Sequence, residues 1–276
     1  MALRGVDISE HNGSVDFAAL KNAGVAFVIL RLGYGSDYTN QDDKRFAENV
    51  RKAEAAGLPW GAYLYSYART TAMAKSEAQH ALRLLGDKKP LYGVWFDVED
   101  TQIAQTDLTA TCKTFCDTLE AAGLYAGIYA SLSWLTTKLS SAQLDRYDKW
   151  VAQWNSSCTY SKAYGIWQYT DKLVIGGKNF DGNYAYKDYP AIVQGMNQPE
   201  EEEEEETMLT YDQWKAYMER YQEEQANKAV SNWAQEAVDF VKTQGYMSGD
   251  TDGNFRPQSP ITRQEVAAVL QNTLGE

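Results

Sequence analysis

Histidine, cysteine and long apolar runs are all scarce in this chain of 276 residues. The two histidines, His11 and His80, leave little material for a His-rich metal site or a His-based triad, so we expect no metal and no cofactor. Three cysteines cannot all pair within one chain, and Cys112 and Cys116 lie one helical turn apart, so free thiols are expected. Any hydrolytic chemistry must therefore run on carboxylates.

Positive charge is scarce as well. The formal net charge of −12 argues against nucleic acid as a partner, because neutralising phosphates requires a basic face. No apolar run approaches membrane-spanning length, and residues 1–5 do not open a signal peptide. We therefore expect a protein made in the cytoplasm that reaches any target outside the cell by another route.

Aromatic side chains are abundant by contrast. Rings make up 13% of the residues, with 19 Tyr and 8 Trp. Rings with polar tips are suited to stacking on sugars, although simple packing also uses them. The hydrophobic share of 44% is enough to build the core of one large domain and a small one.

Short apolar runs alternate with amphipathic stretches from residue 6 to about residue 170, as a parallel α/β fold requires. Eight strands favour an irregular, TIM-like (β/α) barrel over an open doubly wound sheet, because no glycine-rich phosphate loop follows the first strand. A regular barrel takes roughly 250 residues, so the later helices should be short or missing. The predicted strands are 6–9, 25–32, 60–67, 91–98, 125–130, 149–154, 166–169 and 180–184, and the predicted helices are 16–23, 43–56, 71–85 and 107–122.

An unbroken glutamate run at 200–206 divides the chain. It cannot bury a core, and its like charges repel one another into an extended tether. We therefore predict a barrel domain at 1–196, an acidic linker at 197–207 and a helical module at 208–276. The helices predicted in and around the module are 211–227, 233–243 and 263–274.

The same run supports a second hypothesis. Glutamate codons are purine-rich, so a run of them just before Met208 could act as an internal ribosome-binding site and release the module alone. A simple tether is the alternative.

The sharpest local feature is a burst of acids at the end of the strand at 91–98. Residues two apart in a strand share a face, so Asp97 and Glu99 should project together into the barrel mouth, where barrel active sites lie. Close carboxylates in partly apolar surroundings disfavour double ionisation, so one should keep its proton, as a general acid must. Because D-x-E is a short motif, acids that are simply solvated at a strand end are the alternative.

Two further acids occupy equivalent places. Asp7 lies in the first predicted strand and Asp181 in the last, and these strands are neighbours in a closed barrel. We therefore predict that both acids face Asp97 and Glu99, and that the four form a catalytic set. The side chains predicted to bind substrate around the same mouth are Arg31, Tyr63, Tyr65, Tyr129, Trp154, Trp167 and Tyr169.

Several short motifs follow one another between residue 3 and about residue 190. They are Gly5-Val6-Asp7-Ile8-Ser9, Phe27-Val28-Ile29-Leu30-Arg31, Gly61-Ala62-Tyr63-Leu64-Tyr65-Ser66, Phe96-Asp97-Val98-Glu99, Gly127-Ile128-Tyr129, Trp154, Trp167-Gln168-Tyr169 and Asp181. In this order and spacing they resemble the glycoside hydrolase family 25 lysozymes. The resemblance implies an irregular barrel that hydrolyses, without a metal, the β-1,4 bond from N-acetylmuramic acid to N-acetylglucosamine in bacterial peptidoglycan.

The resemblance also implies roles for the four acids. Glu99 would be the acid/base, Asp97 would stabilise the developing positive centre or orient the acetamido group, and Asp7 and Asp181 would complete the acidic floor. Retention through a covalent Asp97 adduct and retention through acetamido participation both stay open. The role of His11 is open too, because the family commonly has another residue soon after the first-strand serine.

The end of the chain, at 237–245, 249–257 and 261–265, resembles one S-layer homology repeat, in which two helices flank a loop that helps bind cell-wall polymers. A calcium loop at 250–253 is an alternative, but its later ligands are out of register. Such repeats usually act in threes and one is present here, so chains are expected to associate through the aromatic stripe Trp214, Tyr217, Met218 and Tyr221. The implied polymer-binding residues are Thr262, Arg263, Glu265, Asp252 and Phe255.

A muramidase with a wall anchor and no secretion signal is most naturally a phage endolysin, held in the host cytoplasm until lysis; a bacterial autolysin is the alternative. Two rival functions are a non-catalytic wall-binding protein and a chitinase-like glycosidase, which also uses a strand-end D-x-E. The complete set of four acids argues against the first, and product analysis separates the second.

Overall fold

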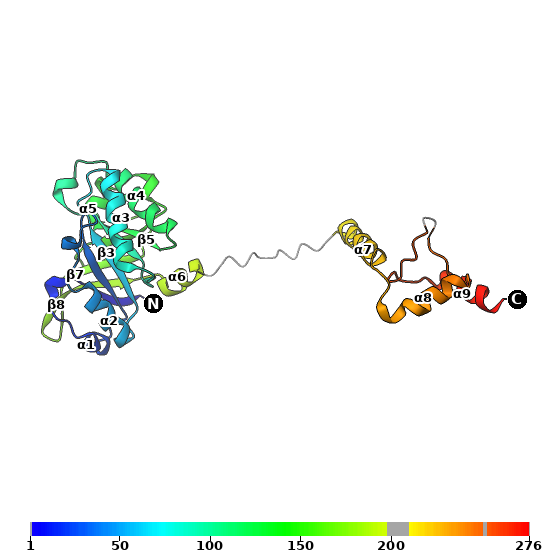
Figure 1. Cartoon of the computed structure of the whole chain (residues 1–276). Coiled ribbons are helices and arrows are strands. Elements are labelled where there is room, and N and C mark those ends of the chain that lie inside the picture. The colour runs from blue at the N-terminus through cyan, green and yellow to red at the C-terminus, as the bar shows by residue number, and fades with distance from the viewer. Residues whose placement is uncertain (1, 198–209, 251–252, 276) are drawn as a thin grey trace. The chain divides into compact units, whose positions relative to one another are not determined.

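The computed structural model describes residues 2–197, 210–250 and 253–275. The chain divides into two compact units, Met1–Pro199 and Glu200–Glu276, each described below by itself (Figure 1). Most of the predicted acidic linker and Met208 lie outside the described residues, so the predicted domain boundaries stay predictions. No helix of the described residues is long and apolar enough to cross a membrane.

The first unit is a closed barrel whose eight strands follow their sequence order. Strands β1 to β7 pair in parallel, whereas β8 runs antiparallel to both β7 and β1. The predicted irregular α/β barrel is therefore confirmed, with a reversed last strand that the sequence did not indicate. The strands are β1 Leu3–Ile8, β2 Phe27–Tyr34, β3 Trp60–Tyr65, β4 Val94–Asp97, β5 Ala126–Ser131, β6 Asp148–Ala152, β7 Ile166–Ile175 and β8 Lys178–Ala185.

The helical layer thins out along the chain, as expected from the small size of the unit. The helix after β5 has only six residues, and β6 is joined to β7 without a helix. β7 then returns directly to β8 through a turn at Gly176 and Gly177, both at positive φ. The helices and 3-10 turns are η1 Glu10–Asn12, α1 Phe17–Asn22, η2 Thr39–Gln41, α2 Phe46–Ala56, α3 Thr71–Leu85, η3 Thr101–Ile103, α4 Leu108–Ala121, α5 Leu132–Thr137, η4 Ala142–Leu144 and α6 Tyr189–Asn197.

Local sequence explains where several of these helices begin. The side chains of Asp16, Thr70 and Asp107 each accept a hydrogen bond from the backbone N–H three residues later, which caps α1, α3 and α4. α2 ends at Gly57, whose left-handed φ of 62° suits glycine. Each helix therefore starts or stops where its own residues satisfy the free backbone groups.

Aromatic rings fill the interior of the barrel. Trp95 is fully buried and meets the rings of Trp150 and Tyr189 edge to face. Gly127 makes room for it, since a Cβ there would lie 2.4 Å from the Trp95 ring. The outer faces of the strands pack on helices, as where Phe96 stacks on a ring of α4. Because both faces are covered, only the strand ends are left to carry chemistry.

Cysteine plays no cross-linking part in the described residues. Cys112 and Cys116 are free and buried, and Cys158 is free and partly exposed. The expectation of free thiols is therefore confirmed.

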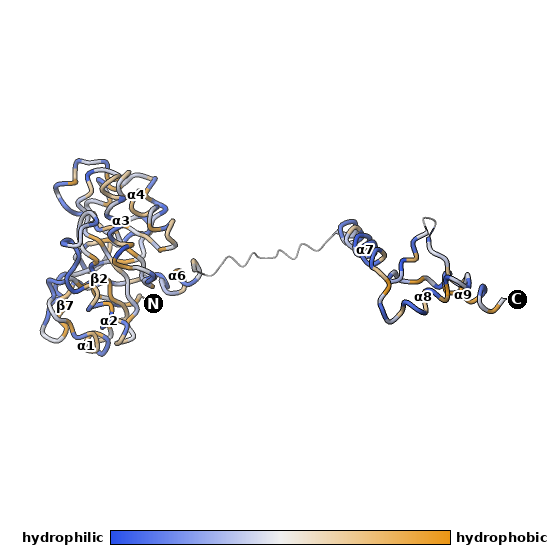
Figure 2. Tube along the Cα trace, in the orientation of Figure 1, coloured by the Kyte–Doolittle hydropathy of each residue, from blue (hydrophilic) through white to orange (hydrophobic). Residues whose placement is uncertain are grey.

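The described part of the second unit is helical, as predicted. It contains α7 Tyr211–Ala226, a 3-10 turn η5 Asn232–Ala234, α8 Gln235–Thr243 and α9 Arg263–Leu274. α7 is mostly blue in Figure 2, because most of its residues are charged or carry amides, and Tyr and Trp score as weakly hydrophilic on that scale, so the colour does not reveal its rings. Trp214, Tyr217 and Tyr221 nevertheless leave half or more of their surface exposed.

Candidate active site

Asp7 and Asp181 form the floor of the barrel mouth. They are direct partners across the β1–β8 ladder, and Asp7 is 7% exposed. One Asp7 oxygen accepts hydrogen bonds from Gln168 Nε2 at 3.0 Å and from Asn183 Nδ2 at 2.8 Å. Burial and then the charge of Asp181 raise the pKa of Asp7 well above its ordinary value, although the two amides oppose this shift.

Asp97 ends β4 and is almost as deeply placed, at 4% exposed. Within the described residues its buried Oδ1 has no hydrogen-bond partner. Burial raises the pKa of Asp97 well above its ordinary value, and the charges of Glu99 and Asp7 add to this, while Arg31 opposes it. Leaving a buried carboxylate oxygen without a partner costs folding free energy. Such an oxygen therefore points to a functional role for Asp97.

Glu99 lies at the rim of the mouth instead of on the floor. β4 stops at Asp97, so Glu99 belongs to the following loop, and its side chain is exposed while Val98 between them is fully buried. The mouth still shields Glu99 enough to raise its pKa, first through loss of solvent and then through the charges of Asp181 and Asp100. A carboxylic acid with a raised pKa at an accessible rim suits a proton donor.

The charges of the four acids change one another's pKa values. Asp181 raises the pKa of Asp7 and of Glu99, and Glu99 and Asp7 both raise the pKa of Asp97. Like charges shift one another this way only when they are close, so acids from the first, fourth and last strands converge on one hollow.

Several of the predicted binding residues surround this hollow. Burial, followed by the charges of Asp7 and Asp97, raises the pKa of Tyr63 well above its ordinary value. Tyr129 donates from its hydroxyl to Gln168 Oε1 at 3.0 Å, and the exposed Trp154 donates from Nε1 to the same oxygen at 3.2 Å. The amide of Gln168 thus ties two rings to Asp7.

Arg31 and Tyr65 lie beside the acids, in a cavity of about 390 Å³. Arg31 pairs with Glu10 and with Asp43, each at 2.9 Å, and Tyr65 donates from its hydroxyl to an oxygen of Asp100 at 3.2 Å. The cavity is lined by Glu10, His11, Arg31, Tyr34, Tyr65 and Tyr67. His11, whose role the sequence left open, therefore lies on the wall of this cavity.

Two predicted positions need correction. Trp167 and Tyr169 do not point into the mouth, because Gln168 between them does so and strand neighbours face opposite ways. Tyr169 stacks on Tyr184 with ring centroids 4.6 Å apart, and Trp167 packs beside both rings. These two residues therefore belong to an aromatic cluster on the outer face of the barrel.

Sequence reasoning missed the two amides that hold Asp7. Gln168 stands in the middle of a motif already noted, and Asn183 lies two residues after Asp181, on the same face of β8. Period-two spacing from Asp181 was the signal that would have found Asn183, whereas Gln168 has no such spacing from any of the four acids.

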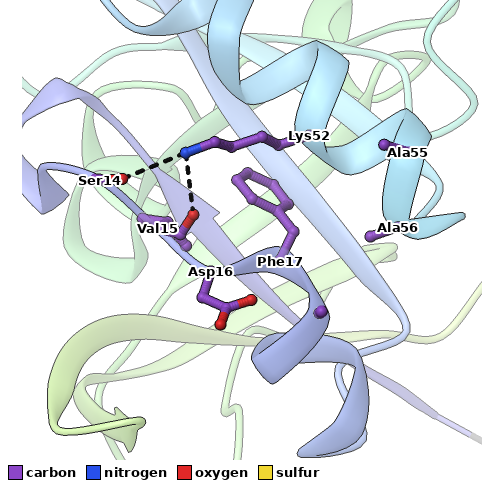
Figure 3. Close-up of a pocket in the computed structure, with 8 residues that line it drawn as sticks. Ser14, Val15, Asp16, Phe17, Lys52, Ala55 and Ala56 are labelled. Atoms are coloured by element: carbon purple, nitrogen blue, oxygen red, sulfur yellow. Dashed lines mark hydrogen bonds between the residues drawn. The ribbon is translucent and has the colours of Figure 1, made fainter.

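A second and larger cavity, of about 530 Å³, lies between the start of α1 and the face of α2 (Figure 3). Its walls are mostly apolar, from Phe17 to Ala55 and Ala56, and Lys52 crosses its rim to Ser14 Oγ at 3.3 Å. None of the four acids lines either cavity, but Arg31 and Tyr65 of the smaller one lie close enough to the acids for their charges to interact, and within the described residues no such link ties the larger cavity to them.

The arrangement at the barrel mouth offers acid and base groups with raised pKa values and a cavity walled by rings. Among the described residues, no group of three or more His, Cys, Asp or Glu side chains is arranged to hold a metal ion. The chemistry that the residues themselves can perform is proton transfer to and from a bound neutral substrate.

In the second unit, three of the five predicted polymer-binding residues, Thr262, Arg263 and Glu265, lie at the start of α9. Thr262 caps that helix and exchanges hydrogen bonds with Glu265, which lowers the pKa of Glu265. Arg263 follows as the first, exposed residue of the helix, and the Phe255 ring lies 5.5 Å from Lys242 Nζ. Asp252 lies outside the described residues.

Two family models match the chain. That of the glycosyl hydrolases family 25 matches residues 6–178, and that of the S-layer homology domain matches residues 228–267. The first match covers well over half of the chain, which therefore belongs to the glycosyl hydrolases family 25. Its C-terminal unit carries an S-layer homology domain.

Similar proteins agree with this assignment. Over 177 residues the chain is 29% identical to an autolytic lysozyme of Clostridium acetobutylicum, a match that covers 63% of this chain and 52% of that protein. The modular autolysin LytC of Streptococcus pneumoniae, solved with a synthetic peptidoglycan ligand, is 26% identical with a TM-score of 0.60, covering 67% of this chain and 47% of that one. The catalytic domain of endolysin ply40 from Listeria monocytogenes bacteriophage P40 is 25% identical with a TM-score of 0.60, covering 71% and 98%. The chain thus spans about half the length of the first two.

Proposed function

We propose that this protein is a muramidase that hydrolyses the β-1,4 bond between N-acetylmuramic acid and N-acetylglucosamine in bacterial peptidoglycan. The observation that carries the proposal is the position of Glu99, an accessible acid with a raised pKa above three buried or half-buried acids. Family membership and the similar lysozymes support the same conclusion.

In the proposed mechanism Glu99 gives its proton to the glycosidic oxygen as the carbon–oxygen bond breaks. Asp97 lies where it can stabilise the positive charge that develops on the sugar, or orient the acetamido group that does so. Glu99, now a carboxylate, then takes a proton from the water that completes hydrolysis. Asp7 and Asp181 lie close enough for the charge of Asp181 to raise the pKa of Asp7, and positive charge developing on the sugar would favour the ionised forms of both acids.

Product analysis tests this function. Digestion of purified peptidoglycan should release new reducing ends of muramic acid, while chitin should give no chitobiose. Chitobiose from chitin would instead indicate the chitinase-like activity, and binding to peptidoglycan without any new reducing ends would indicate the non-catalytic wall-binding protein.

We further propose that the second unit attaches the enzyme to a secondary cell-wall polymer through Thr262, Arg263, Glu265, Asp252 and Phe255. The single S-layer homology domain and the exposed rings of α7 support association of chains through residues 208–276. In this proposal the barrel is residues 1–196, and residues 197–207 act as the tether. The protein would wait in the host cytoplasm and act on the wall at lysis, as a phage endolysin does.

The internal start at Met208 belongs to the same proposal, because a separately made module could associate with full-length chains. Expression with a C-terminal tag should then give a short product that Met208→Leu removes. A short product that persists in this variant would count against an internal start.

A further inference from the structure

Helix α3 buries a carboxylate that the proposed mechanism does not use. Glu77 is fully buried, and the loss of solvent raises its pKa to about 7. Its oxygens accept hydrogen bonds from Ser66 Oγ at 2.8 Å and from the backbone N–H of Tyr67 at 2.9 Å. Within the described residues these two donors are the groups that offset its burial, and no cation does. Burying a carboxylate without a cation costs folding free energy. The contacts of Glu77 are therefore expected to serve something other than stability.

What Glu77 binds is the turn at 66–68, directly after β3. Ser66 Oγ also accepts a hydrogen bond from the backbone N–H of Ala68 at 3.1 Å, which closes the turn on itself. The backbone N–H of Ser66 donates to the carbonyl of Asp97 at 2.9 Å. We call these contacts of Glu77 with the turn at 66–68 the clamp. The clamp is therefore continuous with the end of β4, which carries the candidate catalytic acid Asp97.

The residues on either side of Ser66 form one wall of the cavity beside the acids. The ring centroids of Tyr65 and Tyr67 lie 5.2 Å apart, and the ring centroid of Tyr34, at the end of β2, lies 6.1 Å from that of Tyr67. Without the clamp, the Tyr67 backbone would lose its bond to the helix and the wall would lose its fixed shape.

The same helix also holds the loop that follows β2. One turn after Glu77, His80 lies with Nε2 2.8 Å from an Asp42 oxygen and Nδ1 3.0 Å from the carbonyl of Gly35. Arg83, one further turn along, binds Asp42 as well. On this side of α3, His80 and Arg83 thus contact Asp42. Glu77 contacts the turn after β3 instead.

We propose that Glu77 is a positioning residue for the proposed muramidase reaction, which by clamping the turn at 66–68 holds the rings of Tyr65 and Tyr67 in the shape that receives the glycan. The inference rests on the proposed function. Because these rings would contact the sugar before and during bond breaking alike, their displacement should weaken binding more than it slows the chemical step.

The experiment measures KM and kcat of the full-length protein on a soluble muropeptide tetrasaccharide. Glu77→Ala should raise KM about tenfold and leave kcat within about twofold, and Glu77→Gln, which keeps the shape and one acceptor, should raise KM about threefold. Thr111→Val is the matched control, because Thr111 is equally buried in α4 and its hydroxyl bonds only its own helix, to Leu108. This control should keep the wild-type KM.

A second measurement separates positioning from general stability. In a Glu99→Gln background, which binds without cutting, the affinity for the tetrasaccharide should weaken as the pH falls from about 8 to about 6, because protonation removes one acceptor from Glu77. Addition of Glu77→Gln should flatten that dependence. If Glu77→Ala does not fold, this comparison and the Gln variant decide the matter.

Each outcome bears on one proposal or on both. A wild type that gives no muramic-acid ends overturns the proposed function and this inference together. An active wild type whose Glu77 variants keep its KM and its pH dependence overturns the inference alone. So does a Thr111→Val variant whose KM rises as much as theirs.

Discussion

The barrel and the C-terminal unit use their aromatic side chains in opposite ways. In the barrel, Trp95 and Trp150 are buried. The rings of Tyr63 and Tyr129, which pack on Trp150, lie close to the acids. In the C-terminal unit, Trp214 is 50% exposed and Trp233 is 88% exposed. The described part of the barrel thus buries its own aromatic core, whereas the described part of the other unit exposes apolar rings, the surface that the proposed wall polymer or second chain would cover.

The largest effect should come from the barrel mouth. Glu99→Gln removes the proton donor but keeps its size, so lytic activity should fall about a thousandfold, while the melting temperature stays unchanged because the side chain is exposed. Turbidity loss of cell-wall suspensions and calorimetry measure the two quantities. Glu54→Gln, an exposed acid of α2 paired with Lys88, is the matched control and should keep full activity. If the Glu99→Gln variant stays active, Glu99 is not the proton donor. The contrast between a catalytic barrel and a purely binding C-terminal unit would then lose its basis.

The next effect concerns the exposed rings of α7. Trp214→Ala with Tyr221→Ala should weaken self-association about tenfold, because aromatic anchors supply much of the energy of such contacts. Sedimentation of wild type and variant at micromolar concentration measures it. Lys215→Ala, an exposed neighbour with a weak ion pair to Glu219, serves as the control. A wild type that sediments as a monomer would contradict the proposed association. Binding to the cell wall would then be the remaining role for the exposed rings.

A smaller effect tests the cost of the buried acids. The folded-state pKa of Asp97 is raised by burial and by its acidic neighbours, so the contribution of Asp97 to the stability of the barrel should be most favourable below about pH 4 and be lost as the pH rises through that raised pKa. Asp97→Asn should flatten this dependence and raise the melting temperature at pH 7 by at least ~2 °C, with loss of activity. Melting curves at several pH values decide this. A variant less stable than the wild type at pH 7 would show that Asp97 supports the fold.

The smallest effect separates capping from binding in the C-terminal unit. Thr262 and Thr210 close equivalent capping boxes at the starts of α9 and α7. Replacing either one with Ala should destabilise its helix by about 1 kcal/mol. Only Thr262→Ala should also lower binding to isolated cell walls, measured by co-sedimentation. Equal binding by the two variants would leave Thr262 with a capping role alone.

Local patterns in the sequence were enough to predict most of the fold. The helices at 71–85 and 263–274 begin and end where predicted, because Thr70 and Thr262 satisfy free backbone N–H groups using neighbours in the chain. The bounds of β4 were predicted less accurately, since the strand predicted at 91–98 is Val94–Asp97 in the structure. Strand ends depend on pairing with other strands, which no local pattern records.

The candidate site was predicted less evenly. The acids at Asp7, Asp97, Glu99 and Asp181 were identifiable as strand-end carboxylates, whereas the directions of Trp167 and Tyr169 were not. In β7 the polar Gln168, and not the aromatic residues beside it, faces the acids, so the usual expectation that apolar residues point inward and polar ones outward gives the wrong face there.

The sequence by itself determined the barrel class and the residue types available for chemistry, and it predicted the break at the glutamate run, because these follow from composition, spacing and helix capping. Only the tertiary structure decided that Gln168 and Asn183 hold Asp7, and that Glu77 clamps the turn after β3. The first depends on contacts between residues far apart in the chain, and the second on how α3 packs back against the end of β3. Such contacts, and the loss of solvent that raises the pKa values of the buried acids, exist only once the barrel has closed.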